Sequence, residues 1–387
     1  MANLVTDITG PSLDKMLNYS VTAGSNISNS GNASFYQGNE SNNGGGATQE
    51  EIPFLYTIKV VTSVLFSLVF VLGVLGNTLV ILAATGRIRG LHKTMSVLIL
   101  NLSFADLLYL VFCLPFHATL ITVPSWMFGG FMCKMVQFLI YASMCASSFT
   151  LVAMSMDRYF AVVHPLKFFG VRTLRNVICV ISFIWALAIA CAAPFLFVFE
   201  TFDMLDANGD EVSYCVEVWP DDNPRDDIKL SRRYFYTFLF VISYMLPLLL
   251  MITSYLLILR ALWTTFKPSE DSESSANNAK KKVTLIVSVV VLAFGICWLP
   301  HHIMYMWILY GDFPFTDGTL VLKVTEIIMS SCNSCLNPII YSIMSENFRQ
   351  ALRRYLRRCT SSRERTKVVP RHRRMKLLNR AKRFQVC

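Results

Sequence analysis

The stretch LVAMSMDRYFAVVHP, residues 151–165, ends a long apolar run with two adjacent charges of opposite sign, Asp157 and Arg158. No charged residue occurs between Met135 and Met156. An α-helix needs about 20 predominantly apolar residues to cross a bilayer, and this run has that length. The stretch therefore predicts a transmembrane helix with Arg158 at its charged end, where it can reach water. Taken alone, such a pair is most often a simple interfacial ion pair.

The composition of the whole chain extends this prediction. Of its 387 residues, 54% are hydrophobic and only 16% are charged, whereas a soluble chain carries about 25% charged residues. Buried helices of a soluble core would give shorter apolar runs of about 10–14 residues. We therefore predict an all-α membrane protein, a seven-transmembrane helix bundle. Its seven apolar blocks are Val60–Thr85, Thr94–Ile121, Met135–Met156, Val177–Phe199, Tyr234–Leu259, Val283–Tyr310 and Val321–Met344.

The charges between the blocks predict the orientation. Lys and Arg collect in the cytoplasmic loops of membrane proteins. The first and fifth connections are basic, the loop Thr122–Met132 has no charged residue, and the tail from Ser345 has fifteen Lys or Arg against two acids. We expect a multi-pass protein of the plasma membrane with an extracellular N-terminus and a cytoplasmic C-terminus.

The chain divides into four segments on this reading. Residues 1–53 are rich in Asn, Ser and Gly, which predicts a disordered extracellular N-terminus, and residues 54–345 form the bundle. Residues 346–358 form a short amphipathic juxtamembrane helix, and residues 359–387 form a basic cytoplasmic tail. Four N-x-[ST] sequons in the first segment are predicted glycosylation sites: Asn18, Asn26, Asn32 and Asn39.

The amphipathic helix is predicted from Phe348, Leu352 and Leu356, which recur every four residues among arginines. Such a helix lies along the inner leaflet with its basic face towards anionic membrane lipids. Cys359 follows it and is a candidate palmitoylation site. The basic stretch Arg371–Arg383 also resembles a nucleic-acid-binding segment, but in a membrane protein's tail we predict lipid or protein contacts and no nucleic acid.

The cysteines divide by compartment. Cys133 and Cys215 are the two that lie outside the membrane on the extracellular side, so an oxidising exterior predicts one disulfide between them. Cys332 and Cys335 form a C-x-x-C, a spacing that can indicate redox chemistry or zinc. They lie in an apolar block with no second pair in reach, so we favour packing and predict no metal site of this kind.

From Phe54 to Cys359 the chain resembles rhodopsin-like (class A) G-protein-coupled receptors. One or more motifs of that family stand in each block at consistent intervals. They are GNTLV with Asn77, NLSFADL with Asp106, WMFG before Cys133, MDRYFAVVHPL, Trp185, Pro247 with Tyr255, FGICWLP with Trp298 and Pro300, and NSCLNPIIY with Asn337, Pro338 and Tyr341.

The resemblance implies an allosteric sodium ion and no other cofactor. Asp106 is the only carboxylate deep in the second block, and an acid inside a membrane span is a functional candidate. In the family the matching Asp binds sodium in the inactive state. The residues implied here are Asp106, Ser147, Asn333 and Asn337.

The resemblance also implies a two-state switch. Asp157 holds Arg158, Tyr255 and Tyr341 swing towards Arg158 on activation, and Leu166 inserts into a heterotrimeric G protein. Arrestin is a second expected partner. Many relatives have a Glu at the foot of the sixth helix that also holds the Arg, but this chain has Lys280–Lys282 there.

Two prolines and one tryptophan complete the implied switch. Pro300 and Pro338 each remove a helix hydrogen bond and kink their helices. Trp298 stands two residues before one kink, between the outer cavity and the core. Taken singly, each of the three is equally compatible with ordinary packing.

The ligand is predicted to be a peptide. Amine receptors of the family have an Asp where this chain has Ile140, and opsins have a Lys where it has Ser331. The stretches NLSFADLLYLVFCLPFHAT, CVEVWPDD, FGICWLPHHIMYMW and SENFR resemble galanin receptors and the allatostatin-A receptors of invertebrates. Tyr305 and Leu309 depart from galanin receptors, which have a His and an acid there.

The expected ligand contacts follow from that resemblance, with His302 facing the cavity above Trp298. Packing of His302 in the core is the alternative. The acidic loop 200–232 either attracts a cationic ligand or simply keeps the loop solvated. The expected contact residues are Gln137, Tyr141, His301, His302, Tyr305 and Trp307.

We therefore predict a galanin-like or allatostatin-A-like neuropeptide receptor that activates a heterotrimeric G protein of the Gi/o class. The alternatives are a receptor for another peptide coupled to Gq, or a seven-helix transporter or channel. Transporters usually show internal repeats, and none is visible in this sequence. No catalytic motif such as H-E-x-x-H or G-x-S-x-G occurs, so we expect no enzyme activity.

Overall fold

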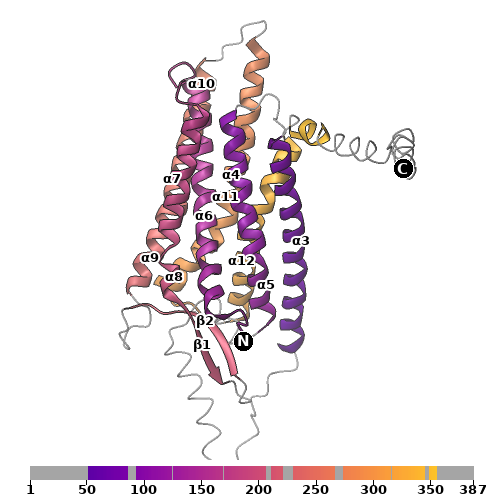
Figure 1. Ribbon diagram of the computed structural model, residues 1–387, viewed down its shortest axis with the longest axis vertical. Coiled ribbons are helices and arrows are strands. Elements are labelled where there is room, and N and C mark those ends of the chain that lie inside the picture. The colour runs from indigo at the N-terminus through magenta and orange to yellow at the C-terminus, as the bar shows by residue number, and fades with distance from the viewer. Residues whose placement is uncertain are drawn as a thin grey trace, which may run out of the picture.

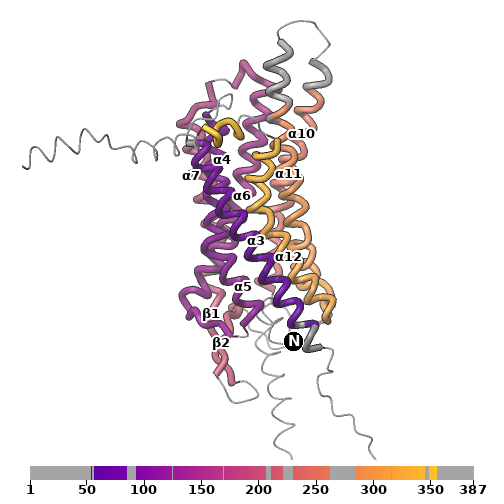
Figure 2. Tube along the Cα trace, turned by 90° about the vertical axis from the view of Figure 1, so that its right-hand side faces the viewer, coloured from indigo at the N-terminus to yellow at the C-terminus, as the bar shows by residue number. Residues whose placement is uncertain are grey.

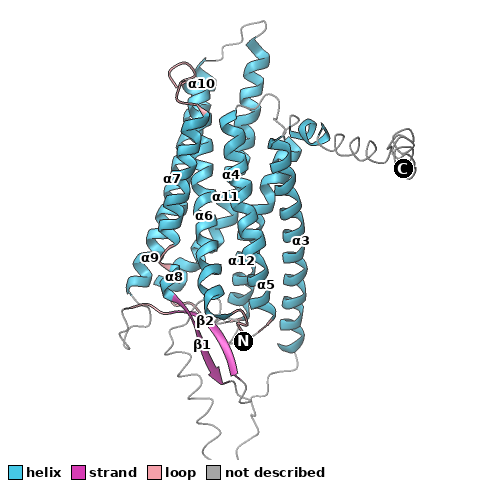
Figure 3. Ribbon diagram, viewed as in Figure 1, coloured by secondary structure: helices cyan, strands magenta, loops and turns pink. Residues whose placement is uncertain are grey.

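Seven long helices run side by side in the computed structural model (Figures 1 and 3). The structure describes residues 51–354 apart from 86–92, 124, 169, 206–210, 221–229, 266–272, 315 and 345–347. Within these residues, seven helical spans are long and apolar enough to cross a membrane. The predicted seven-helix bundle is confirmed. The spans are Tyr56–Ala84, Lys93–Thr122, Gly129–Val163, Leu174–Val198, Leu230–Ala261, Thr284–Tyr310 and Asp317–Met344.

Each span consists of one helix or of helices joined end to end. The first, third, sixth and seventh are single helices: α3 (Glu51–Thr85), α6 (Gly129–Val163), α11 (Glu273–Tyr310) and α12 (Asp317–Met344). The second joins α4 (Lys93–Phe112) to α5 (Leu114–Thr122), and the fourth joins α7 (Leu174–Ala192) to α8 (Phe195–Val198). The fifth joins α9 (Leu230–Phe240), the π-helical turn η1 (Val241–Met245) and α10 (Leu246–Thr265).

Proline explains the breaks, because it lacks an N–H and its ring displaces the carbonyl four residues earlier. Pro115 lies in the first turn of α5, and Pro194 lies between α7 and α8. Pro247 follows the π-helical turn and leaves the carbonyl of Ser243 without its usual partner. The hydroxyl of Ser148 on α6 donates to that carbonyl at 2.6 Å, so the neighbouring helix satisfies it.

Helix α6 is the centre of the bundle and packs against α4, α7, α10 and α11. Its apolar window is 72% buried, compared with 28% for α3 and 22% for the fourth span. Helix α3 lies between α4 and α12, so the first and last spans are neighbours (Figure 2). Asn101 joins three helices, because it donates to Thr150 at 2.7 Å and accepts from Trp185 at 2.9 Å.

A β-hairpin covers one end of the bundle, and no strand was predicted there. Strand β1 (Phe199–Leu205) pairs antiparallel with β2 (Glu211–Glu217) (Figure 3). A disulfide joins Cys215 in β2 to Cys133 in the second turn of α6, with 5.6 Å between their Cα atoms. The predicted disulfide is confirmed, and it fixes the hairpin over the helices. We call this the hairpin end and the opposite end, where α6 carries Arg158, the Arg158 end.

Beyond α12 the chain turns aside at the Arg158 end (Figure 2). Residues 348–354 are helical, and the Phe348 ring lies 6.4 Å from that of Tyr341. Leu356 and Cys359, like the four sequons in residues 1–50, lie outside the described residues.

Candidate functional site

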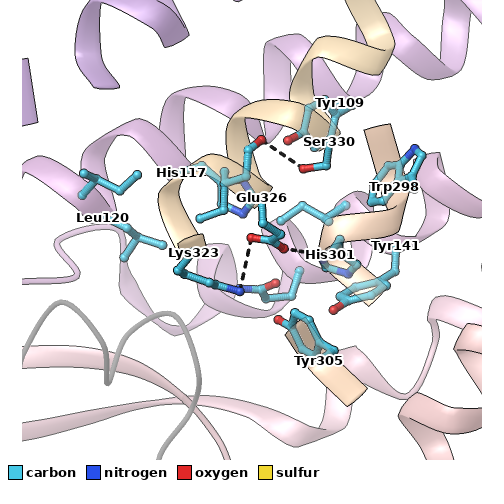
Figure 4. Close-up of a pocket in the computed structure, with 14 residues that line it drawn as sticks. Tyr109, His117, Leu120, Tyr141, Trp298, His301, Tyr305, Lys323, Glu326 and Ser330 are labelled. Atoms are coloured by element: carbon cyan, nitrogen blue, oxygen red, sulfur yellow. Dashed lines mark hydrogen bonds and ion pairs between the residues drawn. The ribbon is translucent and has the colours of Figure 1, made fainter. Parts of the chain in front are cut away.

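A cavity of about 60 Å³ lies at the hairpin end between the helices. It has room for a few water molecules or the tip of a ligand side chain. Residues from the second, third, sixth and seventh spans surround it (Figure 4). Its polar and aromatic lining residues are Tyr109, His117, Gln137, Tyr141, Trp298, His301, Tyr305, Lys323, Glu326 and Ser330.

Three ionisable side chains meet in this cavity (Figure 4). The Glu326 carboxylate is only 2% exposed and forms a hydrogen bond with Nδ1 of His301. Its other oxygen, Oε2, lies 3.5 Å from Nζ of Lys323. The same ammonium group lies 4.6 Å from the centroid of the Tyr305 ring, a cation–π distance. Helices α11 and α12 are therefore linked across the cavity by one carboxylate.

The sequence reasoning did not identify Lys323 and Glu326 as site residues. The signal was present, because both charges stand inside the predicted apolar block Val321–Met344. A charged residue within a span is rare and faces the bundle interior or an aqueous cavity.

Besides Oε2 of Glu326, which faces Lys323, two polar atoms of the cavity residues have no hydrogen-bond partner among the described residues. They are Nδ1 of His117 and the indole Nε1 of Trp298. Leaving a buried polar group unsatisfied costs about 1–3 kcal/mol. A ligand group that satisfied either atom would therefore bind more tightly than its apolar contacts alone allow.

Aromatic rings connect the cavity to the hairpin. The Tyr141 ring stacks on Phe195 at 4.0 Å, and the Tyr236 ring lies 5.1 Å from that of Tyr305. Tyr236 donates a hydrogen bond to Glu217 of β2, and Nε of Arg232 lies 2.7 Å from the same carboxylate. The base of the hairpin and the start of the fifth span are thus held together beside the cavity.

A second polar cluster surrounds Asp106 deeper in the bundle. Asp106 is 1% exposed and accepts a hydrogen bond of 2.8 Å from the side-chain amide of Asn337. Ser147 lies beside the same carboxyl group, and Asn333 is buried without a described contact to it. One oxygen of Asp106 and the amide oxygen of Asn337 lack a hydrogen-bond partner among the described residues. Two such oxygens suit a hard cation, so these residues fit sodium.

A side chain of α3 supplies the hydrogen bond that Pro338 removes from α12. Its ring leaves the carbonyl of Ser334 free, and the amide of Asn77 donates to that carbonyl at 2.8 Å. Gly76 permits the approach, because a Cβ at that position would lie 2.8 Å from Cβ of Pro338. The kink in α12 is therefore held by the first span.

The Arg158 end holds the charge pair of the opening stretch. The Asp157 carboxylate accepts from Arg158, from Thr94 at 3.1 Å, and from Nε and Nη2 of Arg172 at 2.9 and 3.0 Å. Arg158 is only 8% exposed, so the prediction that it reaches water is wrong. Two arginines and a threonine enclose the carboxylate, and the sequence reasoning missed Arg172 and Thr94.

Residues 76–341 match the profile of the 7 transmembrane receptor (rhodopsin family). The chain belongs to the rhodopsin family of seven-transmembrane receptors. It is therefore a signalling receptor rather than an enzyme, and a multi-pass protein of the plasma membrane.

The receptor is also similar to named members of that family. It is 43% identical to galanin receptor type 1 of Homo sapiens over 293 residues, which cover 75% of this chain and 80% of that protein. It is 39% identical to galanin receptor 2b of Danio rerio over 312 residues, 80% and 78% of the two chains. It is 38% identical to galanin receptor type 2 of Mus musculus over 325 residues, 84% and 82% of the two chains.

Of the receptor's six predicted ligand contacts, four line the cavity: Gln137, Tyr141, His301 and Tyr305.

His302 does not line the cavity, so the expectation that it faces the cavity is wrong. Its ring packs 4.6 Å from Tyr244 and 5.4 Å from Phe240. Trp307 does not line it either; it is 38% exposed and contacts Phe313. Successive helical residues point about 100° apart, so a helix that turns His301 into the cavity turns these two away.

The other predicted switch residues have no described hydrogen bond to Arg158. Leu166 is 93% exposed in the loop after α6. Tyr341 is buried, Tyr255 is half-buried, and neither has a described hydrogen bond to Arg158. The side chains of Lys280 and Lys281 lie outside the described residues.

Proposed function

We propose that a neuropeptide of the galanin or allatostatin-A type activates this receptor from the hairpin end. The hairpin end and the N-terminus are then extracellular, and the Arg158 end and the C-terminus are cytoplasmic. The observation that carries the proposal is the cavity over Trp298, whose wall holds Tyr141, His301 and Tyr305. Similarity to galanin receptors supports a peptide as the ligand.

The path from ligand to helix movement starts at His301. The centroid of its ring lies 5.5 Å from that of Trp298 and 4.6 Å from that of Tyr305. A ligand group that contacts His301 therefore also affects the packing of both neighbouring rings. Pro300 stands between His301 and Trp298 in α11 and weakens the helix there. If this turn of α11 has two conformations, a ligand that binds one of them more tightly shifts the receptor towards that conformation.

A sodium ion is proposed at Asp106 in the inactive state. Asp106, Ser147 and Asn337 would hold it, and Asn333 is the fourth ligand that the family resemblance implies. When bound, the ion supplies a positive charge that stabilises the buried carboxylate and the arrangement of α4, α6 and α12 around it.

At the Arg158 end, we propose that a heterotrimeric G protein of the Gi/o class binds, with arrestin as a further partner. The exposed Leu166 supports a docking role for the loop after α6. Release of Arg158 from Asp157 would free a guanidinium for the G protein. Coupling to Gq, and a different peptide as ligand, are the alternatives.

The experiment is peptide-stimulated GTPγS incorporation in membranes that contain the receptor and Gi/o, with galanin and allatostatin-A peptides as probes. His301→Phe and His302→Phe form a matched pair, because the residues are adjacent and only His301 lines the cavity. We expect His301→Phe to raise the peptide concentration needed for half-maximal response by at least tenfold, and His302→Phe to change it little at equal surface expression. A peptide-evoked current without GTPγS incorporation would instead support a channel.

A further inference from the structure

A second, larger cavity lies on the outer surface of the bundle, well away from the ligand cavity. It is a groove of about 470 Å³ between α6, α7 and α10. Val152 and Ala153 of α6 line it together with Val180 and Phe183 of α7 and Leu246 and Leu250 of α10. Phe183 is 68% exposed, and Leu246 and Leu250 are each more than 40% exposed. These side chains point outward from the bundle of membrane spans. In the membrane, the groove therefore opens to bilayer lipid.

The length of the groove matches one leaflet. Its lining along α7 runs from Asn176 to Leu187, which at 1.5 Å per residue is about 17 Å. The hydrocarbon core of a bilayer is about 30 Å thick, so one leaflet supplies about 15 Å. A single acyl chain therefore extends over the whole groove from the Arg158 end towards the middle of the membrane.

The Arg158 end of the groove is basic. Arg172 and the first turn of α7 line it there. The carboxylate of Asp157 also lines this end, but residues 158–175 contain four basic residues, Arg158, Lys167, Arg172 and Arg175, and no further acidic residue. Arg172 uses Nε and Nη2 to bind Asp157, and Nη1 has no described partner. Arg175 is exposed, without an ion pair among the described residues.

The backbone adds to this positive potential. Helix α7 has 19 residues and begins at Leu174 after the N-cap Thr173, so its N-terminus lies at the same end of the groove. The Thr173 side chain accepts from the N–H of Asn176, and the N–H groups of Leu174 and Arg175 before it have no intrahelical partner and favour an anion. Basic side chains and a helix N-terminus thus surround the place where an acyl chain in the groove would reach the membrane surface.

We propose that the groove between α6, α7 and α10 binds an anionic phospholipid, with an acyl chain in the groove and the phosphate beside Arg172 and Arg175. A sterol would fill the apolar part, but its one hydroxyl group would leave the basic end without an anion. This site is separate from the short helix after α12, which lies on the other side of the bundle from α7 (Figure 1).

The site has a consequence for the Arg158 end. Arg172 contacts Asp157, which in turn binds Arg158. Only the Arg172 side chain therefore separates a bound phosphate from the Asp157 carboxylate, which binds Arg158.

The test uses the full-length receptor in nanodiscs of phosphatidylcholine with one-fifth phosphatidylserine, with and without cholesterol. Native mass spectrometry then counts the lipids that remain bound after transfer to detergent. Ala153→Phe fills the groove floor, and Ala186→Phe is its control, because Ala186 is exposed on α7 outside the groove. Arg175→Gln removes a headgroup contact, and Lys282→Gln on α11 is its control because Lys282 is also exposed.

We expect wild type to retain phosphatidylserine over phosphatidylcholine and Ala153→Phe to lose that lipid. Arg175→Gln should weaken the preference about fivefold, since one basic residue near an anionic surface contributes that factor. Both controls should match wild type. Equal phosphatidylserine retention by wild type and Arg175→Gln would overturn the proposal, even if Ala153→Phe failed to fold. Retention of cholesterol in place of phosphatidylserine, abolished by Ala153→Phe, would overturn it in favour of a sterol.

Discussion

Removing the carboxylate of Glu326 should destabilise the receptor about twice as much as removing the ammonium of Lys323. Glu326 is the one carboxylate within ion-pair distance of Lys323 among the described residues. Lys323 is 5% exposed, so Glu326→Gln leaves a buried cation without its counter-charge. Lys323→Met leaves Glu326 with His301, which remains hydrogen-bonded to it.

The magnitude follows from the energetics of buried ion pairs. Breaking such a pair by removal of one partner costs about 3–5 kcal/mol, because an uncompensated charge remains buried. We therefore expect a loss of about 3–5 kcal/mol in the free energy of unfolding for Glu326→Gln and roughly half of that for Lys323→Met. Replacing both partners by groups of similar volume is often close to neutral. The double variant should therefore be more stable than Glu326→Gln alone.

The assay is a double-mutant cycle in bicelles, with the free energy of unfolding measured by steric trapping for wild type, both single variants and the double variant. A coupling free energy of at least 2 kcal/mol or so is expected for two charges in contact inside the bundle. Additive losses of less than about 1 kcal/mol for each single variant would refute the reasoning, because hydrated surface pairs behave in that way.

Three further outcomes are expected. Cys133→Ala or Cys215→Ala should remove most surface expression or peptide binding, since each frees the hairpin; binding assays on intact cells measure this, and normal binding by both would contradict it. Asp106→Asn should abolish any effect of sodium on agonist affinity in competition binding, whereas a wild-type receptor insensitive to sodium would exclude the ion. Asp157→Asn should raise basal GTPγS incorporation severalfold. Arg158→Ala should still bind agonist but should no longer stimulate nucleotide exchange. Equal, mild effects of both variants on GTPγS incorporation would indicate a simple interfacial ion pair.

The bundle could be predicted from sequence because lipid imposes a simple rule on it. A span must satisfy its own backbone, so each is a long apolar helix, and length and composition alone reveal it. The hairpin β1–β2 follows no such rule. It lies outside the membrane, where strands are short and their pattern is weak, so only the disulfide between Cys133 and Cys215 indicated how the loop is held.

The candidate site was predicted less completely, because its geometry depends on helix rotation. The sequence places His301 and His302 side by side and does not say which ring faces the cavity. The two rings point about 100° apart. The packing of α11 against α12, and of the His302 ring against Tyr244 of η1, determines which ring faces the cavity. Arg172 illustrates the other limit: it is fourteen residues beyond Arg158, and the loop geometry that brings it to Asp157 is not encoded by any local pattern.

The three prolines Pro247, Pro300 and Pro338 do not behave alike, and the difference concerns which helices supply the missing hydrogen bond. At Pro247 the freed carbonyl of Ser243 receives the hydroxyl of Ser148 from α6, and at Pro338 the freed carbonyl of Ser334 receives the amide of Asn77 from α3. In both places a second helix fixes the kink, so bending there requires two helices to move together. No such donor is described for the carbonyl that Pro300 frees in α11. Tyr244 of η1 does donate at 2.9 Å to the carbonyl of Gly295, one residue before the freed one. Because no second helix is described as holding the freed carbonyl itself, we expect the kink of α11 to respond more readily than the other two to what binds beside His301.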